Sequence, residues 1–238
     1  MNKFLAALAV SVLGSSGAAM AGPNADFNAT FSDTYASYRS ALFATNSGNP
    51  EKSQQALDTF DAKWTALLSD YSATPPPQYA EDPLWGETLS TVTDHLQQAE
   101  AAAAEGKLPA SHLALEGIRD AVGDLHARNG IETFSDRMNA YHAEMEHVLE
   151  TDMTNLDAAA MQSLLERAAV LSYLADDTLQ SPPPEVAAGN AEYDALAAAF
   201  KASVDQMQTA ARSGDPEALR GAAAGLKVPY SKFFLKFG

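Results

Sequence analysis

The chain has 238 residues, of which 46% are hydrophobic, 8% aromatic and 19% charged, and it contains no cysteine. Its 15 basic and 31 acidic residues give a net charge of −16, which argues against nucleic acid or an anionic membrane surface as the main partner, because both repel an acidic chain. The absence of cysteine excludes disulfides, thiolate metal sites, cysteine nucleophiles and covalent c-type haem. The apolar fraction is that of a packed protein of one or two domains.

The first 21 residues have the pattern of a secretory signal peptide. Lys3 precedes an apolar run over residues 4–13, and Ala19, Met20 and Ala21 form an A-x-A cleavage signal before Gly22. The run is too short to span a bilayer, and without cysteine no lipoprotein anchor is expected. An ordinary buried helix is the alternative. We expect a bacterial periplasmic protein that starts at Gly22, and since cleavage removes one Lys and no acid, its charge goes from −16 to −17.

Apolar residues in the rest of the chain recur at spacings of three and four, the period of an α-helix. No convincing two-residue alternation indicates a strand. The apolar stripes that predict the first four helices run over Phe31 to Leu42, Leu57 to Tyr71, Trp85 to Ala99 and Leu115 to Leu125. The predicted fold class is all-α.

Two short motifs each occur twice. TFSD stands at residues 30–33 and 133–136, and PPP stands at residues 75–77 and 182–184. In TFSD the Thr can cap a helix while the Asp three residues later reaches back, as in a capping box. Triple proline cannot continue a helix and predicts a stiff, extended link.

The second half of the chain follows the first with a shift of 108 residues, which places Trp85 opposite Tyr193. We interpret the shift as an internal duplication of roughly 105 residues, a common domain size. Four helices per copy predict two tandem antiparallel four-helix bundles, over residues 22–130 and 131–238. A single eight-helix domain with a shared core is the alternative.

The end of each copy resembles the superfamily of cytochrome c-prime and soluble b-type cytochromes. The likeness lies in a secreted, Ala-rich four-helix unit whose last helix is rich in aromatic residues, here LKVPYSKFFLKFG over Leu226–Gly238. The resemblance implies a haem-binding histidine on that helix. In the second copy Phe233 or Phe234 stands near its position, so this copy looks haemless. In the first copy His126 stands there, but the methionine that b-type members supply from helix one is missing.

All five histidines lie in one stretch of the chain. They are His95, His112, His126, His142 and His147. Such asymmetry is expected if one region acquired a site that its duplicate lacks, although five residues could also cluster by chance.

The segment MNAYHAEMEH places three metal-ligand types on one helix face. Met138, His142 and Met145 are spaced by four and three residues. Thioether and imidazole together suit copper, particularly Cu(I). The alternative is that both methionines fill the core, which is their usual role on an apolar stripe.

Glu144 and His147 have the E-x-x-H spacing of carboxylate-bridged di-iron bundles, but only one such pair occurs where two are needed. Upstream, His112 and Glu116 are four residues apart on one face, with Arg119 close by. A helix-borne imidazole and carboxylate can bind iron, copper or zinc if further ligands are present. The alternative is a solvated polar stripe in which Glu116 and Arg119 form an exposed ion pair of little energetic value.

The two histidine-bearing helices are joined only by Asn129 to Glu132, so we expect them to be neighbours in space. An antiparallel pair would bring His112 near His147, or His126 near Met138, and the sequence does not choose between these. A metal site at the junction of the bundles is the resulting hypothesis.

No phosphate-binding loop, G-x-S-x-G elbow or H-E-x-x-H motif occurs, so we expect a protein that is not an enzyme. The leading hypothesis is a periplasmic protein that binds or delivers a copper or iron ion, with a periplasmic or inner-membrane transport or redox protein as partner. Its candidate ligands are His112, Glu116, His126, Met138, His142, Met145 and His147. The alternatives are a metal-free module that binds a protein or small ligand between the bundles, and an electron-transfer protein with non-covalent b-type haem.

Overall fold

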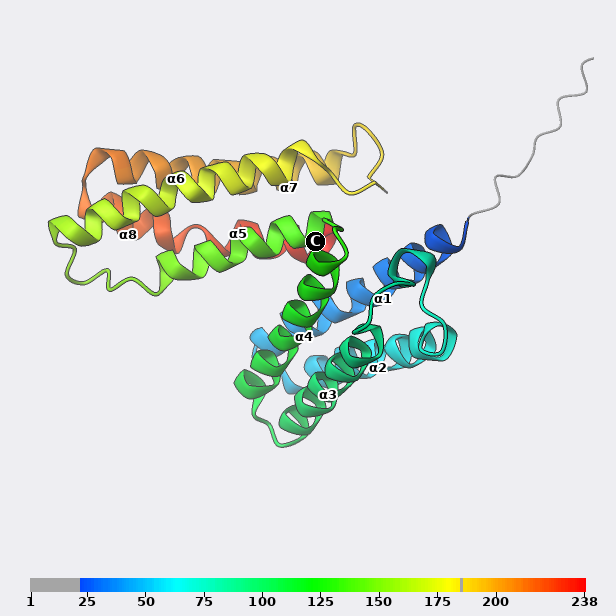
Figure 1. Ribbon diagram of the computed structural model, residues 1–238. Helices are drawn as coiled ribbons and strands as arrows, with labels where there is room; N and C mark the ends of the chain where they lie inside the picture. Colours follow the sequence, from blue (N-terminus) through cyan, green and yellow to red (C-terminus); the bar gives the residue numbers. More distant parts are fainter. Residues whose placement is uncertain (1–21, 185) are drawn as a thin grey trace, which may run out of the picture.

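The computed structural model describes residues 22–184 and 186–238 (Figure 1). Within these residues the chain forms nine α-helices and one short 3₁₀ helix and no strand, which confirms the all-α prediction. The predicted signal peptide lies outside the described residues. No helix in the described part combines the length and the apolar character needed to cross a membrane.

The first four helices form an up-and-down bundle. Helix α1 packs against α2 and α4, and α3 packs against the same two helices. Aromatic side chains, among them Tyr38, Phe60 and Trp85, fill its core. The helices are α1 (Pro23–Asn46), α2 (Pro50–Tyr71), α3 (Trp85–Ala104) and α4 (Leu108–Arg128). The 3₁₀ helix η1 (Pro77–Tyr79) lies in the connection between α2 and α3 and begins at the last residue of the first triple proline.

The second half forms a bundle in which two helices share the fourth position. Its helices are α5 (Phe134–Leu149), α6 (Ala158–Gln180), α7 (Ala191–Ser213), α8 (Pro216–Ala224) and α9 (Lys227–Phe237). The helical segment that corresponds to the fourth helix is interrupted at Gly225 and Leu226, between α8 and α9. Pro229 accounts for the break, because in one continuous helix it would leave the Gly225 carbonyl unbonded and clash with it. In the first turn of α9 a proline is tolerated.

Each bundle has its own buried core, and Leu42 on α1 packs against both. Helices α1 and α9 hold the bundles together, with α5 beside α9. The bundles lie at an angle, and the chain turns a corner between α4 and α5 (Figure 1). The internal duplication stays a prediction, although each helix of the first bundle has a counterpart in the second.

The two TFSD motifs have different structures. Thr133 and Asp136 form the expected capping box at the start of α5, where Thr133 accepts a hydrogen bond from the Asp136 backbone N–H at 3.2 Å. The prediction of a cap at Thr30 is wrong, because α1 already begins at Pro23. Proline at the first position and Asp26 in the first turn favour this earlier start. The Thr30 hydroxyl instead donates to the Asp26 carbonyl within the helix.

This difference gives a matched pair of substitutions. Thr133→Ala should lower the free energy of unfolding by about 1 kcal/mol, because it removes a helix cap. Thr30→Ala should change it by less than about 0.5 kcal/mol, since Thr30 is half-buried within α1, caps no helix end and bonds only to the helix's own backbone. Urea denaturation followed by circular dichroism measures both values. Equal losses in the two variants would contradict the assignment of only one cap.

Candidate functional site

A polar cavity of about 270 Å³ lies where the two bundles meet, and we call it the junction cavity. Helices α1, α4, α5 and α9 all contribute to its wall. Six of its side chains are charged or carry imidazole rings on α4, α5 and the start of α9. They are His112, Glu116, Arg119, His142, Glu146 and Lys227. Three of the seven candidate metal ligands, His112, Glu116 and His142, therefore share one cavity.

The ring of His112 is oriented by the backbone of α1. Its Nδ1 lies 3.0 Å from the Leu42 carbonyl oxygen and 3.2 Å from the Thr45 hydroxyl. Since a carbonyl only accepts, Nδ1 carries the proton and Nε2 carries the lone pair when the ring is neutral. Burial lowers the pKa of His112 and so favours the neutral form. The Nε2 lone pair then lies 3.7 Å from Oε1 of Glu116.

His142 has the opposite tautomer. Arg119 Nη1 donates to its Nδ1 at 3.0 Å, so the ring proton is on Nε2, which lies 3.3 Å from Glu146 Oε1. Burial lowers the pKa of His142 to about 3, and the neighbouring positive charges of Arg119 and Lys227 add to the effect. The ring also stacks on Tyr230, with 5.2 Å between the ring centroids. His142 is therefore neutral, accepts a hydrogen bond at Nδ1 and lies close to the Glu146 carboxylate at Nε2.

Each carboxylate of the junction cavity lies close to a cationic side chain. Arg119 Nη1 is 3.8 Å from Glu116 Oε1, and Lys227 Nζ is 3.7 Å from Glu146 Oε1. With both imidazoles neutral, the cavity has two carboxylates and three cationic side chains, since Arg39 also lines it. Among the described residues no three side chains of His, Cys, Asp or Glu converge closely enough to form a ready-made metal site. The pairs His112–Glu116 and His142–Glu146 both line the junction cavity but do not form one ligand cluster.

The structure separates the other four candidate ligands from this cavity. Met138 and Met145 are completely buried in the core of the second bundle, so the proposed Met–His face is not available to a metal ion. His147 is exposed and faces Glu150 at 4.0 Å. Its E-x-x-H partner Glu144 instead binds Arg167 at 3.0 Å.

His126 lies elsewhere in the junction, buried to 4% exposure. Its Nδ1 is 2.8 Å from Asp136 Oδ2, and Asp136 also accepts from the backbone N–H and hydroxyl of Thr133 at 2.7 Å each. Burial of Asp136 favours its neutral form, but the hydrogen bonds from His126 and Thr133 outweigh that and lower its pKa. Helices α4 and α5 do not pack side by side as an extended antiparallel pair; they meet at a corner where His126 binds Asp136, two residues before Met138.

Sequence reasoning missed Glu146 and Lys227. Glu146 follows His142 by four residues, the same spacing as Glu116 after His112, so a search for a second His-x-x-x-Glu pair would have found it. No local signal marks Lys227, which reaches the cavity only because α9 packs against α1 and α5.

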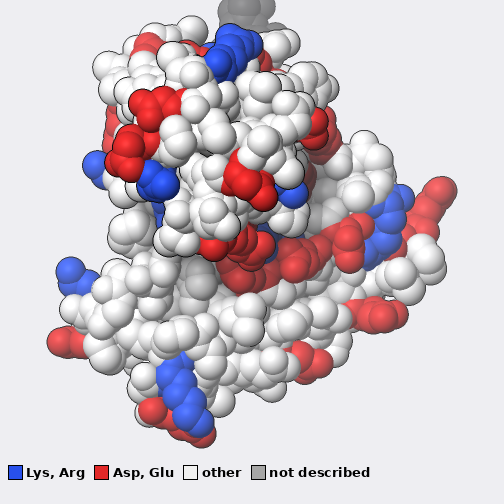
Figure 2. Space-filling view, turned by 90° about the vertical axis from the view of Figure 1, so that its left-hand side faces the viewer, with Lys and Arg blue, Asp and Glu red and all other residues white. Residues whose placement is uncertain are grey.

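Acidic side chains extend beyond the junction cavity. Figure 2 shows them gathered in a band where the two bundles meet on this face. Asp120, Asp124 and Glu132 line a hollow between α4 and α5 that adjoins the cavity at Arg119. This negative field attracts cations in general and selects none.

No protein-family model, curated protein or solved structure matches the chain. The cytochrome-like relationship thus stays a prediction that rests on architecture. His126 lines a second cavity between the bundles. No methionine is among the described residues that line it, so this cavity offers no His–Met pair for haem. Function has to be argued from the side chains of the junction.

The neutral state of His142 has a consequence for stability. Its pKa is lower in the folded chain than in the unfolded chain, so below about pH 6.5 the unfolded state binds a proton that the folded state does not. By pH 5 this difference should cost roughly 2 kcal/mol of stability. His142→Phe keeps a ring that can stack on Tyr230 and should remove this part of the pH dependence. Denaturation curves at pH 7 and pH 5 measure it, with His147→Phe as the exposed control; equal pH dependence in His142→Phe and the native chain would contradict the assignment.

Proposed function

We propose that this protein is a periplasmic, non-enzymatic carrier that binds a copper or iron ion in the junction cavity, on His112 and Glu116, and releases it again. The observation that carries the proposal is the tautomer of His112. Its Nδ1–H is engaged by the Leu42 carbonyl, which leaves an unprotonated Nε2 at 3.7 Å from Oε1 of Glu116. Two acceptors that face each other without a proton between them suit a bound cation.

The distance between His112 Nε2 and Glu116 Oε1 also supports a cation bound by both atoms. Two ligand atoms bound at about 2.1 Å to one ion lie roughly 3 to 3.5 Å apart. His112 Nε2 and Glu116 Oε1 are 3.7 Å apart, so a small side-chain adjustment would suffice. The bond from Nδ1–H to a backbone carbonyl is the outer-shell contact that metal-binding histidines usually make.

The second pair explains why such binding would be reversible. His142 accepts from Arg119 at Nδ1 and faces Glu146 with its Nε2–H, so it is not free to ligate without losing these contacts. A cation would therefore have only two protein ligands, with water in its remaining positions. Few ligands and two nearby positive charges favour exchange with a partner over permanent storage.

The residues in the cavity also refine which ion to expect. With both methionines in the core, the thioether ligands that select Cu(I) are missing from the site. One imidazole and one carboxylate suit Cu(II) and iron, and also zinc. Periplasmic location is part of the same proposal and rests on the signal-peptide pattern, as does a periplasmic or inner-membrane partner that receives the ion.

Titration of the purified protein with Cu(II), and with Fe(II) under anaerobic conditions, tests the proposal by calorimetry. We expect one ion per chain, and an affinity at least about tenfold weaker in His112→Ala and Glu116→Gln. His147→Ala is the matched control on an exposed histidine and should bind like the native chain. Absence of stoichiometric binding, or an equal loss in His147→Ala, would refute the proposal.

Arg119 provides a test with the opposite sign. It lies 3.8 Å from Glu116 and repels a cation held there. Arg119→Gln should therefore tighten metal binding by several-fold, since one unit of positive charge leaves the site. An unchanged or weaker affinity, with the circular dichroism spectrum preserved, would place the ion elsewhere.

A further inference from the structure

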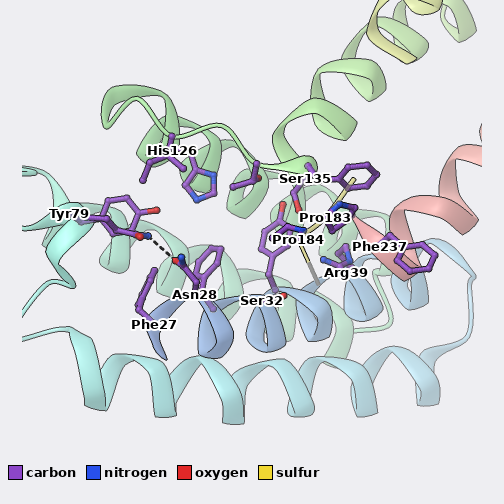
Figure 3. Close-up of a pocket in the computed structure, with 17 residues that line it drawn as sticks. Phe27, Asn28, Ser32, Arg39, Tyr79, His126, Ser135, Pro183, Pro184 and Phe237 are labelled. Atoms are coloured by element: carbon purple, nitrogen blue, oxygen red, sulfur yellow. Dashed lines mark hydrogen bonds between the residues drawn. The ribbon is translucent and has the colours of Figure 1, made fainter. Parts of the chain in front are cut away.

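The second cavity, which His126 helps to line, has a volume of about 330 Å³, and we call it the aromatic cavity (Figure 3). Its wall comes from α1, η1, the end of α4, the start of α5, the second triple proline and the end of α9. Since both bundles and their connections form it, it exists only in the folded whole chain. Its size is within the range of small-molecule sites, which often lie at domain interfaces.

A row of three rings on α1 forms one part of this wall. Phe27, Phe31 and Tyr35 are spaced by four residues, so they share one face of the helix. Adjacent rings are stacked at interplanar angles of 25° and 19°, with 5.6 and 5.8 Å between their centroids. The His126 ring meets Phe31 edge to face at 5.9 Å. Such a row of flat faces and edges suits a planar aromatic ligand.

Two aromatic side chains of the wall keep part of their surface uncovered. The core rings of the bundles, such as Phe60 and Phe200, are buried, whereas Phe31 on α1 and Phe237 at the end of α9 are only partly buried. Both line the aromatic cavity, one from each bundle, and the partly buried Ile131 lies in the same wall. A ligand between the bundles would remove this apolar surface from water, which favours binding.

An amide pair stands at one end of the aromatic cavity (Figure 3). Gln78 Nε2 donates to Asn28 Oδ1 at 3.0 Å, and the Gln78 backbone N–H donates to Asn24 Oδ1 at 3.1 Å. The first bond holds the Asn28 amide with its oxygen toward η1. Within residues 22–184 and 186–238 the Asn28 Nδ2 group has no hydrogen-bond partner, so its two donors are available to an acceptor on a ligand.

We propose that the aromatic cavity binds a small, uncharged, planar aromatic molecule that accepts a hydrogen bond from Asn28. Contact with the rings of Phe31 and Phe237 supplies most of the affinity, and Asn28 orients the ligand. No part of the recognition depends on Arg39, whose guanidinium donates to the Leu235 carbonyl and lies over the Tyr35 ring. This would be a second binding function, separate from the metal ion in the junction cavity.

The test uses naphthalene-2-carboxamide as the probe and decahydronaphthalene-2-carboxamide as its saturated, non-planar counterpart. Binding to the whole protein is measured by ligand-observed NMR and calorimetry. We expect saturable binding of the planar amide, at least about fivefold tighter than that of the saturated one, because aromatic pairs gain energy beyond their buried area. No saturable binding of the planar amide, or equal affinities for the two amides, would overturn the proposal.

Two exposed serines on α1 give a matched pair of variants that locates the site. Ser32 lines the aromatic cavity, whereas Ser40 is not among the residues of its wall. Ser32→Trp places a large ring in the cavity and should abolish binding of the planar amide, while Ser40→Trp should bind like the native chain. Undiminished binding in Ser32→Trp, or an equal loss in both variants, would overturn the proposal. Metal binding in Ser32→Trp should be unchanged, so failure of this proposal and failure of the metal proposal are distinguishable.

Asn28→Asp tests the hydrogen bond to the ligand. The variant keeps the oxygen that accepts from Gln78 and removes only the Nδ2 donors. Binding of the planar amide should weaken about three- to tenfold, the usual effect of one hydrogen bond. Binding of 2-methylnaphthalene, which has no acceptor, should stay within about twofold. An unchanged affinity for the planar amide would overturn the role assigned to Asn28.

Discussion

The carboxylate of Asp136 joins the two halves of the molecule. It closes the capping box at the start of α5 and binds His126 in the last turn of α4, so one side chain links the end of one bundle to the beginning of the next. Burial disfavours its charge, yet the donors of His126 and Thr133 keep it ionised, which makes the contact both strong and directional. This contact lies at the corner between α4 and α5, and the shape of the space between the bundles depends on that corner.

Two cavities with opposite chemistry result from that corner. The junction cavity has two carboxylates and three cationic side chains around two neutral imidazoles, whereas the aromatic cavity, of about 330 Å³, is lined mainly by aromatic rings (Figure 3). Arg39 on α1 lines both. Helix α1 is therefore the common wall, and its packing against α9 brings the chain's last helix to both sites.

Sequence periodicity predicted the helices well because core burial follows the helical repeat. Leu57, Trp64 and Leu67, for example, are all buried as their spacing indicated. The capping-box motif, by contrast, misled at Thr30, since the sequence TFSD can begin a helix or lie inside one, depending on the residues before it. The prediction of a single fourth helix in the second copy missed the break between α8 and α9, although Pro229, which lacks an N–H, is the residue that causes it.

For the candidate site, the sequence by itself determined which helix faces carry imidazole next to carboxylate, because a spacing of four residues places both on one side of any α-helix. It also excluded thiolate chemistry through the lack of cysteine. Only the tertiary structure decided which of those faces meet. It buried Met138 and Met145, tied His126 to Asp136, left His147 in solvent and brought Lys227 to Glu146. The reason is that the angle between the bundles depends on contacts distant in sequence, on which local periodicity carries no information.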